Sequence, residues 1–220
     1  MKAFIKKHEY NYIKKCLYDL NNAFRNCIDI DTVETTKAYI QDKILNIFDN
    51  LSDEERDLLD ISKITDSLHI SPYLTKLDEY TYGMPNITAS QISKLFRKEK
   101  KLKLPDLNKE DSKNVYLGWI DQSIRKLLVV YNMDSKFIGM SCRIQNFNSN
   151  NTNICVLCNH IGGEDEVAFV SPICKTSNAG QDAYRSIGFH VCLDSEKCNE
   201  RITSTDKLEK LLKDVNNIKK

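Results

Sequence analysis

Two closely spaced pairs of cysteines near the C-terminal end constrain the fold of this 220-residue chain more than any other feature. The first pair is Cys155-x2-Cys158 and the second is Cys192-x5-Cys198. Zn²⁺ favours four soft ligands in a tetrahedron, and a tight knuckle delivers two thiolates from a single turn. The pairs therefore predict one zinc site that pins together the segments on which they lie.

The sequence around these pairs has the layout of a treble-clef finger. Strand-like segments over 167–170 and 187–191 separate the two pairs, and a helical period begins at about Thr203. A knuckle, a hairpin and then a helix that starts close to the last ligands would surround a single ion. We therefore expect a treble-clef-like zinc finger at this end of the chain.

The ligand set has alternatives. The x5 spacing of the second pair is looser than the usual C-x2-C, and His190 and Cys174 compete as ligands. The competing interpretation is that the cysteines are unrelated buried thiols, because free Cys behaves as a small hydrophobic residue. If four thiolates bind the ion, no position is left for water or substrate, and the zinc is structural.

The first 100 residues have the apolar period of helices. Ile13, Leu17, Leu20 and Phe24 recur at three- and four-residue steps, which places them on one face of a helix. Helix starts are expected at Asp31, at Ser52 with Glu55 in a capping box, at Ser71 before Pro72, and at Thr88. This half is predicted to be a helical bundle with short connections.

The period changes after about residue 112. Short apolar segments over 115–117, 127–131 and 137–140, with turn residues at 132–135, predict a small antiparallel sheet. The fold class is therefore α+β, with a helical bundle domain over 1–105 and a β-rich, treble-clef-like zinc-finger domain over 112–220. Trp119, the only tryptophan, is expected to pack between the two halves.

Charge and hydropathy restrict the environment and the partners. The formal net charge of +1 argues against a chain-wide attraction to nucleic acid or to an anionic membrane. No apolar run is long enough to span a membrane, and the N-terminus lacks the apolar region of a secretion signal, so we expect a cytoplasmic protein. From Asn153 to Glu200 seven acids face three bases, which favours a protein partner over phosphate.

One segment has the opposite charge. Residues 94–103 contain six Lys or Arg residues and a single acid, Glu99. The favoured interpretation is a solvated helix end, and the alternative is a patch for RNA or for an acidic protein surface.

The sequence offers no catalytic equipment that we recognise. It lacks the phosphate-binding, dinucleotide-binding, zinc-protease and nucleophile-elbow motifs. Of its four histidines, His160 and His190 lie near the cysteines, but neither has an evident nucleophile and carboxylate beside it, so we do not expect an enzyme.

Six short motifs, spread through most of the chain, are together more specific than any one of them. They are Leu95–Lys98, Lys100–Lys103 with Pro105, Tyr116–Asp121, Arg125–Tyr131, Cys155–Asn159 and Cys192–Asn199. In this combination the chain resembles the elongation factor G-binding protein family, which includes the FusB/FusC-type fusidic acid resistance proteins. The x5 spacing of the second cysteine pair is the spacing of that family.

The resemblance implies a helical bundle followed by a treble-clef-like zinc domain with one zinc, which binds elongation factor G. In the resistance proteins this binding frees the factor from ribosomes on which fusidic acid has trapped it. By position, Tyr184, Gly188 and His190 lie in the segment used for contact, and Leu208 on the final helix is a further candidate. His190 stands where the family has an aromatic residue, and Ile187 where it has a lysine.

Two functional hypotheses follow. The first is a factor that binds elongation factor G, prefers a conformation incompatible with the ribosome-bound one, and so promotes release, touching the ribosome only indirectly. The second is an RNA- or ribosome-binding zinc protein that uses the basic run. Salt dependence separates them, because each phosphate contact adds about 0.7 to 0.9 to the slope of log affinity against log salt.

Overall fold

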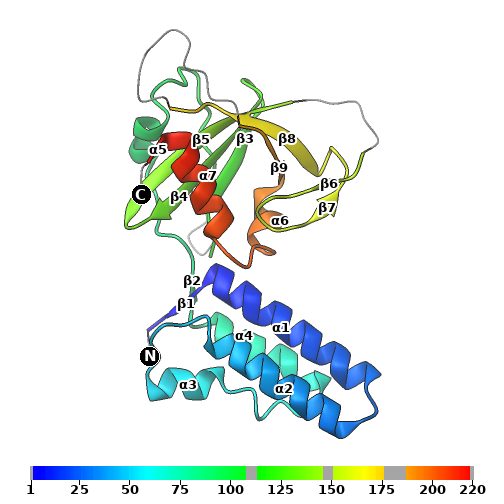
Figure 1. Cartoon of the computed structure of the whole chain (residues 1–220). Coiled ribbons are helices and arrows are strands. Elements are labelled where there is room, and N and C mark those ends of the chain that lie inside the picture. The colour runs from blue at the N-terminus through cyan, green and yellow to red at the C-terminus, as the bar shows by residue number, and fades with distance from the viewer. Residues whose placement is uncertain (1, 108–112, 146–150, 176–186, 219–220) are drawn as a thin grey trace. The chain divides into compact units, whose positions relative to one another are not determined.

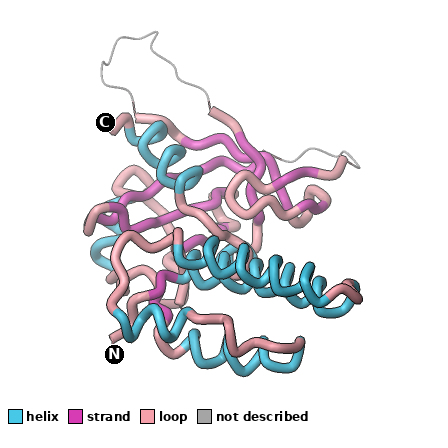
Figure 2. Tube along the Cα trace, turned by 60° about the horizontal axis from the view of Figure 1, so that its bottom comes forward, coloured by secondary structure: helices cyan, strands magenta, loops and turns pink. Residues whose placement is uncertain are grey.

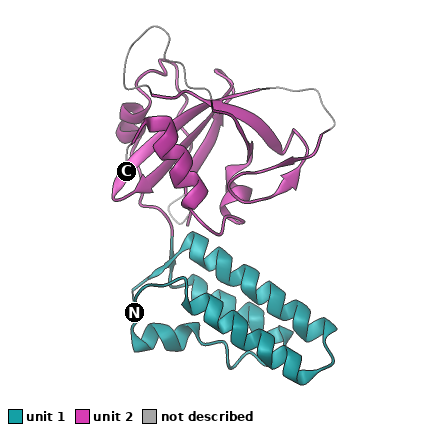
Figure 3. Ribbon diagram, in the orientation of Figure 1, with its two compact units in different colours: residues 1–82 teal, residues 83–220 magenta. Residues whose placement is uncertain are grey.

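A computed structural model describes residues 2–107, 113–145, 151–175 and 187–218. The chain divides into two compact units, residues 1–82 and 83–220 (Figure 3). The domains expected from the sequence, 1–105 and 112–220, stay a prediction. The contact-based division lies earlier in the chain, because Ile92 and Phe96 pack against Leu128 and Val130 of the second unit.

The first unit is built from helices. Its elements are β1 (Ile5–Lys6), α1 (Lys7–Asn26), α2 (Ile30–Leu45), α3 (Asp53–Leu59), the 3-10 helix η1 (Ser67–His69), α4 (Ile70–Asp78) and β2 (Thr81–Tyr82). Figures 1 and 2 show α1 and α2 side by side, and the parallel pair β1–β2 joins the two ends of the unit. Ile13, Leu17 and Leu20 of the predicted stripe are fully buried in its core. No helix in the described ranges is long and apolar enough to cross a membrane.

The hydrogen bonds at the helix N-termini show which of the predicted helix starts are present in the structure. The predicted box at Ser52 is confirmed: its hydroxyl accepts from the amide of Glu55 at 3.3 Å, and its own amide donates to the Glu55 carboxylate at 2.8 Å. Thr88 forms the same arrangement with Gln91 at the start of α5 (Ala89–Leu95).

Two other predicted starts were wrong. Asp29, not Asp31, caps α2, because Asp29 has the extended backbone that lets its carboxylate accept from the amides of Asp31 and Thr32. Helix α4 begins before Ser71, since η1 runs directly into it. Pro72 then lies in the first turn, where a missing amide costs nothing.

A five-stranded antiparallel sheet forms the centre of the second unit. Its order is β3-β4-β5-β8-β9, and the strands are β3 (Leu117–Asp121), β4 (Lys126–Met133), β5 (Lys136–Ile144), β8 (Val167–Pro172) and β9 (Phe189–Cys192). A separate two-stranded ribbon joins β6 (Asn153–Ile154) to β7 (Ile161–Gly162), and the helices α6 (Ser195–Asn199) and α7 (Asp206–Asn216) end the unit (Figure 1). The α+β fold class is thereby confirmed.

Strand β4 is buried on both faces of the sheet. Leu128 and Val130 face the cluster built by α5, whereas Leu127 and Val129 face the cluster that contains α7. This alternation is the period-two geometry of a strand between two layers. Trp119 belongs to the α5 layer, where its ring lies edge-on to Phe96 at 5.7 Å between centroids. Trp119 therefore does contact the half of the chain predicted to be helical, although the contact-based division places both Phe96 and Trp119 in the second unit.

The turn after α5 is held to the sheet by Glu99. The Glu99 carboxylate accepts from the Lys126 ammonium at 2.6 and 2.7 Å and from the Ser141 hydroxyl at 2.8 Å. Burial opposes ionisation of Glu99, but these hydrogen bonds outweigh it and hold its pKa below the usual range. Both side chains of the ion pair are largely buried, so the pair is shielded from screening by salt.

We expect Glu99→Gln to lower the free energy of unfolding by about 2 kcal/mol, because it leaves the Lys126 ammonium buried without a counter-charge. Urea unfolding at neutral pH measures the change. Lys197→Gln is the control, since it removes an ion pair with Asp194 that is largely exposed, and it should cost less than about 0.5 kcal/mol. Equal effects of the two substitutions would contradict the assignment of Glu99 as the anchor of this turn.

Candidate metal centre

The structure brings the four paired cysteines together. Their sulfur atoms all lie within 4.8 Å of one another. Cys155 Sγ is 4.0 Å from Cys198 Sγ, and Cys158 Sγ is 3.6 Å from Cys192 Sγ. Four sulfurs at the Zn–S distance in a tetrahedron would be about 3.8 Å apart. The spacing therefore fits a tetrahedral thiophilic metal such as Zn²⁺.

The first two cysteines lie on the knuckle between β6 and β7. The amide of Cys155 donates to the carbonyl of His160 at 2.8 Å, and the amide of Asn159 donates to the carbonyl of Cys155 at 2.9 Å. Asn159 has φ 59°, a left-handed conformation that asparagine tolerates better than most residues. The turn therefore places two thiols on one side of the ribbon.

The other two cysteines come from different elements. Cys192 is the last residue of β9, and Cys198 lies on the short helix α6. Backbone bonds hold the knuckle against them: the amide of Val156 donates to the carbonyl of His190 at 2.9 Å, and the amide of Cys192 donates to Cys155 Sγ at 3.4 Å. An amide aimed at a sulfur stabilises its thiolate, as second-shell donors do in metal sites.

The thiols influence one another strongly at these distances. Hydrogen bonds from Cys158, Cys192 and Cys198 lower the pKa of Cys155, whereas the bonds to Cys155 raise the pKa of Cys192 and of Cys198. The bond to Cys155 opposes ionisation of Cys158, but the bonds to Cys192 and Cys198 outweigh it and lower the pKa of Cys158. By themselves the four groups therefore favour a mixture of thiolates and thiols. A divalent cation at their centre would stabilise all four as thiolates, which is the charge state that structural zinc requires.

Asn199, the residue after Cys198, connects the cluster to the sheet. Its carbonyl oxygen accepts from the amides of Val115 and Tyr116 at 2.7 and 3.0 Å. Its amide group donates to the carbonyls of Tyr116 and Ser195 at 2.9 and 2.8 Å. Ser195 adds a bond from its hydroxyl to the carbonyl of Gly118. Sequence reasoning placed Asn199 in a motif but did not find this role, because Val115 and Tyr116 lie more than 80 positions away.

The two alternative ligands lie elsewhere. The cluster found within the described residues consists of the four cysteines and contains neither His190 nor Cys174. The His190 ring packs edge-on against Phe169 at 5.2 Å, and Cys174 Sγ lies 3.9 Å from the carbonyl of Pro172.

The residues expected to contact a partner have different positions. Tyr184 lies outside the described residues. Gly188 and His190 both lie against Phe169, and a Cβ at Gly188 would be 2.1 Å from the tip of that ring, so a larger residue would have to displace the ring. Leu208 is fully buried in the core of the second unit. The expectation of a direct contact through Leu208 is therefore corrected: its side chain holds α7 on the sheet.

Sequence reasoning missed an exposed apolar pair beside the cluster. Ile154 of β6 and Ile161 of β7 are cross-strand partners, and they are 57% and 60% exposed. Large apolar side chains facing each other in water indicate a contact surface when they are grouped on one module. The signal was present in the sequence as an isoleucine on each side of the knuckle.

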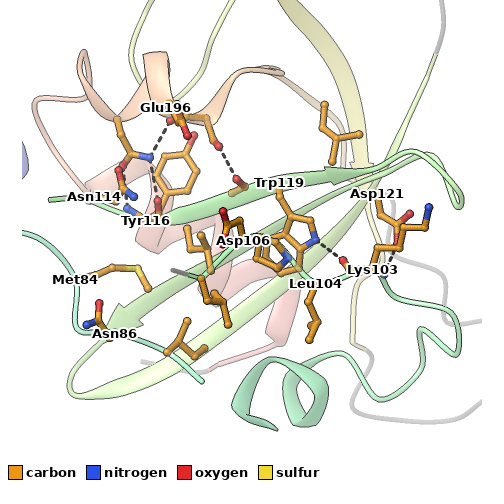
Figure 4. A pocket seen from close by; sticks show the side chains of 18 of the residues that line it. Met84, Asn86, Lys103, Leu104, Asp106, Asn114, Tyr116, Trp119, Asp121 and Glu196 are labelled. Carbon is orange, nitrogen blue, oxygen red and sulfur yellow. Dashed lines mark hydrogen bonds between the residues drawn. The ribbon is translucent and has the colours of Figure 1, made fainter. Parts of the chain in front are cut away.

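A pocket of about 520 Å³ lies between α6, the edge strand β3 and the segments around Met84 and Leu104 (Figure 4). Several of its polar groups maintain the fold. The Asp121 carboxylate accepts from the amides of Lys103 and Ser123, and the Trp119 indole donates to the carbonyl of Lys103. These bonds tie the segment before β3 to the strand itself and account for the polar wall of the pocket.

Comparisons with known proteins cover both units. The model described as elongation factor G-binding protein, N-terminal, matches residues 4–85, and the model of the FBP C-terminal treble-clef zinc-finger matches residues 86–218. A solved structure entitled fusidic acid resistance protein FusC is 27% identical, with a TM-score of 0.78 over 97% of this chain and 98% of that one. No curated protein sequence gives a significant match.

We expect Asn199→Ala to lower the free energy of unfolding by about 3 kcal/mol, because it leaves buried backbone groups of Val115 and Tyr116 without partners. Urea unfolding of the metal-loaded protein measures the loss. Asn151→Ala, at an exposed asparagine of the same unit, should change stability by less than about 0.5 kcal/mol. If both variants unfold at the same urea concentration, Asn199 does not couple α6 to the sheet.

Proposed function

The chain belongs to the elongation factor G-binding protein family, and from this premise we propose that it binds elongation factor G through the module that carries the four cysteines. We further propose that binding releases the factor from the ribosome and protects translation against fusidic acid. Similarity to a fusidic acid resistance protein over nearly the whole chain supports the second step.

The single observation that carries the binding surface is the exposed pair Ile154–Ile161 on the ribbon beside the cluster. The ribbon is tied to β9 through the bond from Val156 to His190, and the half-exposed rings of Phe169 and His190 pack together on the adjoining strands. Apolar and aromatic side chains at the centre of a patch, with acidic residues such as Asp165 nearby, match the composition of protein interfaces. Phosphate is a poor partner for such a surface.

We propose that the metal is one Zn²⁺ held by Cys155, Cys158, Cys192 and Cys198. The distances between the sulfurs, the burial of three of the four residues and the amide donated to Cys155 support this ligand set. A site closed by four thiolates contributes stability and shape rather than chemistry. The ion would hold the ribbon, β9 and α6 in the arrangement that presents the contact surface.

The proposed mechanism is differential binding. A partner that binds a free conformation of elongation factor G more tightly than the ribosome-bound one shifts the population toward release, whereas equal affinity would shift nothing. Under this proposal the protein acts in the cytoplasm, where its partner works, and supplies no catalytic group to GTP hydrolysis by the factor.

The metal proposal predicts about one zinc per chain in the purified protein. Cys198→Ser should lose the ion and the tertiary packing of the second unit, as measured by elemental analysis and near-UV circular dichroism. Cys27→Ser, at an exposed cysteine of the first unit, is the matched control and should keep both. Full zinc content in the Cys198 variant would show that this ligand set is wrong.

The binding proposal predicts that the protein co-elutes with elongation factor G at moderate salt. The double variant Ile154→Ser, Ile161→Ser should weaken the affinity at least about tenfold, because it removes two apolar anchors, while the zinc content stays unchanged. The matched control is Ile28→Ser, Ile30→Ser, which removes two exposed isoleucines from the first unit.

The control variant should bind like the wild type, in titration calorimetry with the purified factor. If the two double variants bind equally well, the contact surface lies elsewhere. Release of elongation factor G from the ribosome is measured in a separate experiment with the same variants. Sedimentation of ribosomes with fusidic acid should show less bound factor when the wild type is added, and the Ile154/Ile161 variant should fail to reduce it.

A further inference from the structure

The side chains of segment 94–103, called here the basic turn, fall into a buried set and an exposed set. Its anchors face the unit: Phe96 is buried, and Leu95, Glu99 and Leu102 are half-buried. All six cations of the turn are exposed to solvent, and they are Lys94, Arg97, Lys98, Lys100, Lys101 and Lys103. The fold therefore presents a group of positive charges on one short stretch of surface.

The only acid of the basic turn does not neutralise these cations. Glu99 points toward the sheet, where its carboxylate is bound by Lys126 and Ser141. None of the six exposed cations forms an ion pair with an acid in the described parts of the chain. These positive charges are thus available to an external partner. The basic turn differs in this from a helix surface on which each cation forms a salt bridge with a neighbouring acid.

The composition of the turn favours nucleic acid over protein as that partner. Lysine is depleted at the centres of protein interfaces, which rely on aromatic and apolar anchors, whereas Lys and Arg neutralise the phosphates in nucleic-acid complexes. The apolar residues of the turn are directed into the fold and give a protein partner little to bury. Clustered, flexible cations on a turn can follow the phosphates of a single strand.

We propose that the basic turn binds the phosphate backbone of single-stranded RNA. The choice of RNA over DNA rests on the proposed function, because a protein that acts on ribosome-bound elongation factor G works beside ribosomal RNA. The acidic cysteine module and the basic turn then have separate partners: the module takes the protein factor and the turn takes the polyanion. A net charge of +1 for the whole chain is compatible with this, since the contact depends on local charge.

The test is fluorescence anisotropy with a labelled single-stranded RNA of about twenty nucleotides, at salt concentrations from about 50 to 200 mM. The variant is the full chain with Arg97→Gln, Lys98→Gln, Lys100→Gln and Lys101→Gln. The matched control removes the same charges from exposed positions of the first unit: Arg25→Gln, Lys14→Gln, Lys15→Gln and Lys63→Gln. Both variants have the same net charge, so only the position of the lost cations differs.

The wild type and the control should bind the RNA with the same steep salt dependence. In the basic-turn variant the slope of log affinity against log salt should fall by about 0.7 for each lost contact, so by about 3 if all four contribute. Equal slopes for the two variants would overturn the proposal. So would a basic-turn variant that binds RNA normally but no longer co-elutes with elongation factor G, since the turn would then contact the protein.

The RNA titration contains no elongation factor. Its outcome is therefore distinguishable from that of the co-elution experiment: either proposal can fail while the other holds.

Discussion

The approach of four cysteine sulfurs to one point is the interaction on which the second unit depends. The elements that carry them are too short to persist alone, because β6 and β7 have two residues each and α6 has five. The proposed metal would cross-link these short elements and add to the contacts of the apolar core. Three of the four cysteines are also members of the hydrophobic cluster under α7, so the proposed metal site and the core are one continuous packing.

Local signals carried the sequence predictions that succeeded. The box at Ser52, the helix start at Thr88 and the apolar stripe of α1 need only residues within one or two turns. The spacing of the cysteines was also sufficient to predict that the four sulfurs lie together, since two closely spaced pairs in a chain expected to stay reduced have few other uses. The cap at Asp29 was missed by two positions because Asp29 and Asp31 are chemically alike, and only the backbone conformation chooses between them.

The remaining features depend on contacts between distant positions. Leu208 lies with Leu212 and Val215 on the buried face of α7, whereas the family resemblance suggested a surface role for it. The approach of Phe169 to Gly188 depends on the register of β8 against β9, which the sequence does not reveal. Trp119 was expected to contact the other predicted half, but the sequence did not single out Phe96 as its partner.

The x5 spacing of the second cysteine pair has a physical reason in this arrangement. A C-x2-C pair would put both sulfurs on one turn, whereas five intervening residues let Cys192 remain in β9 while Cys198 lies on α6. The inserted residues start that helix, because the Asp194 carboxylate accepts from the amide of Lys197 at 3.0 Å. The Ser195 hydroxyl also donates to the carbonyl of Gly118, and this bond attaches α6 to strand β3.

Gly118 completes this docking from the side of the sheet. A Cβ there would lie 2.8 Å from both the Ser195 side chain and the Tyr116 ring, so the strand can approach α6 only with glycine. The motif around Gly118 and the motif around the second cysteine pair are thus two halves of one joint, although they are far apart in the sequence. A ligand spacing that looked irregular for metal binding alone is the spacing that also fastens the cysteine cluster to the edge of the sheet.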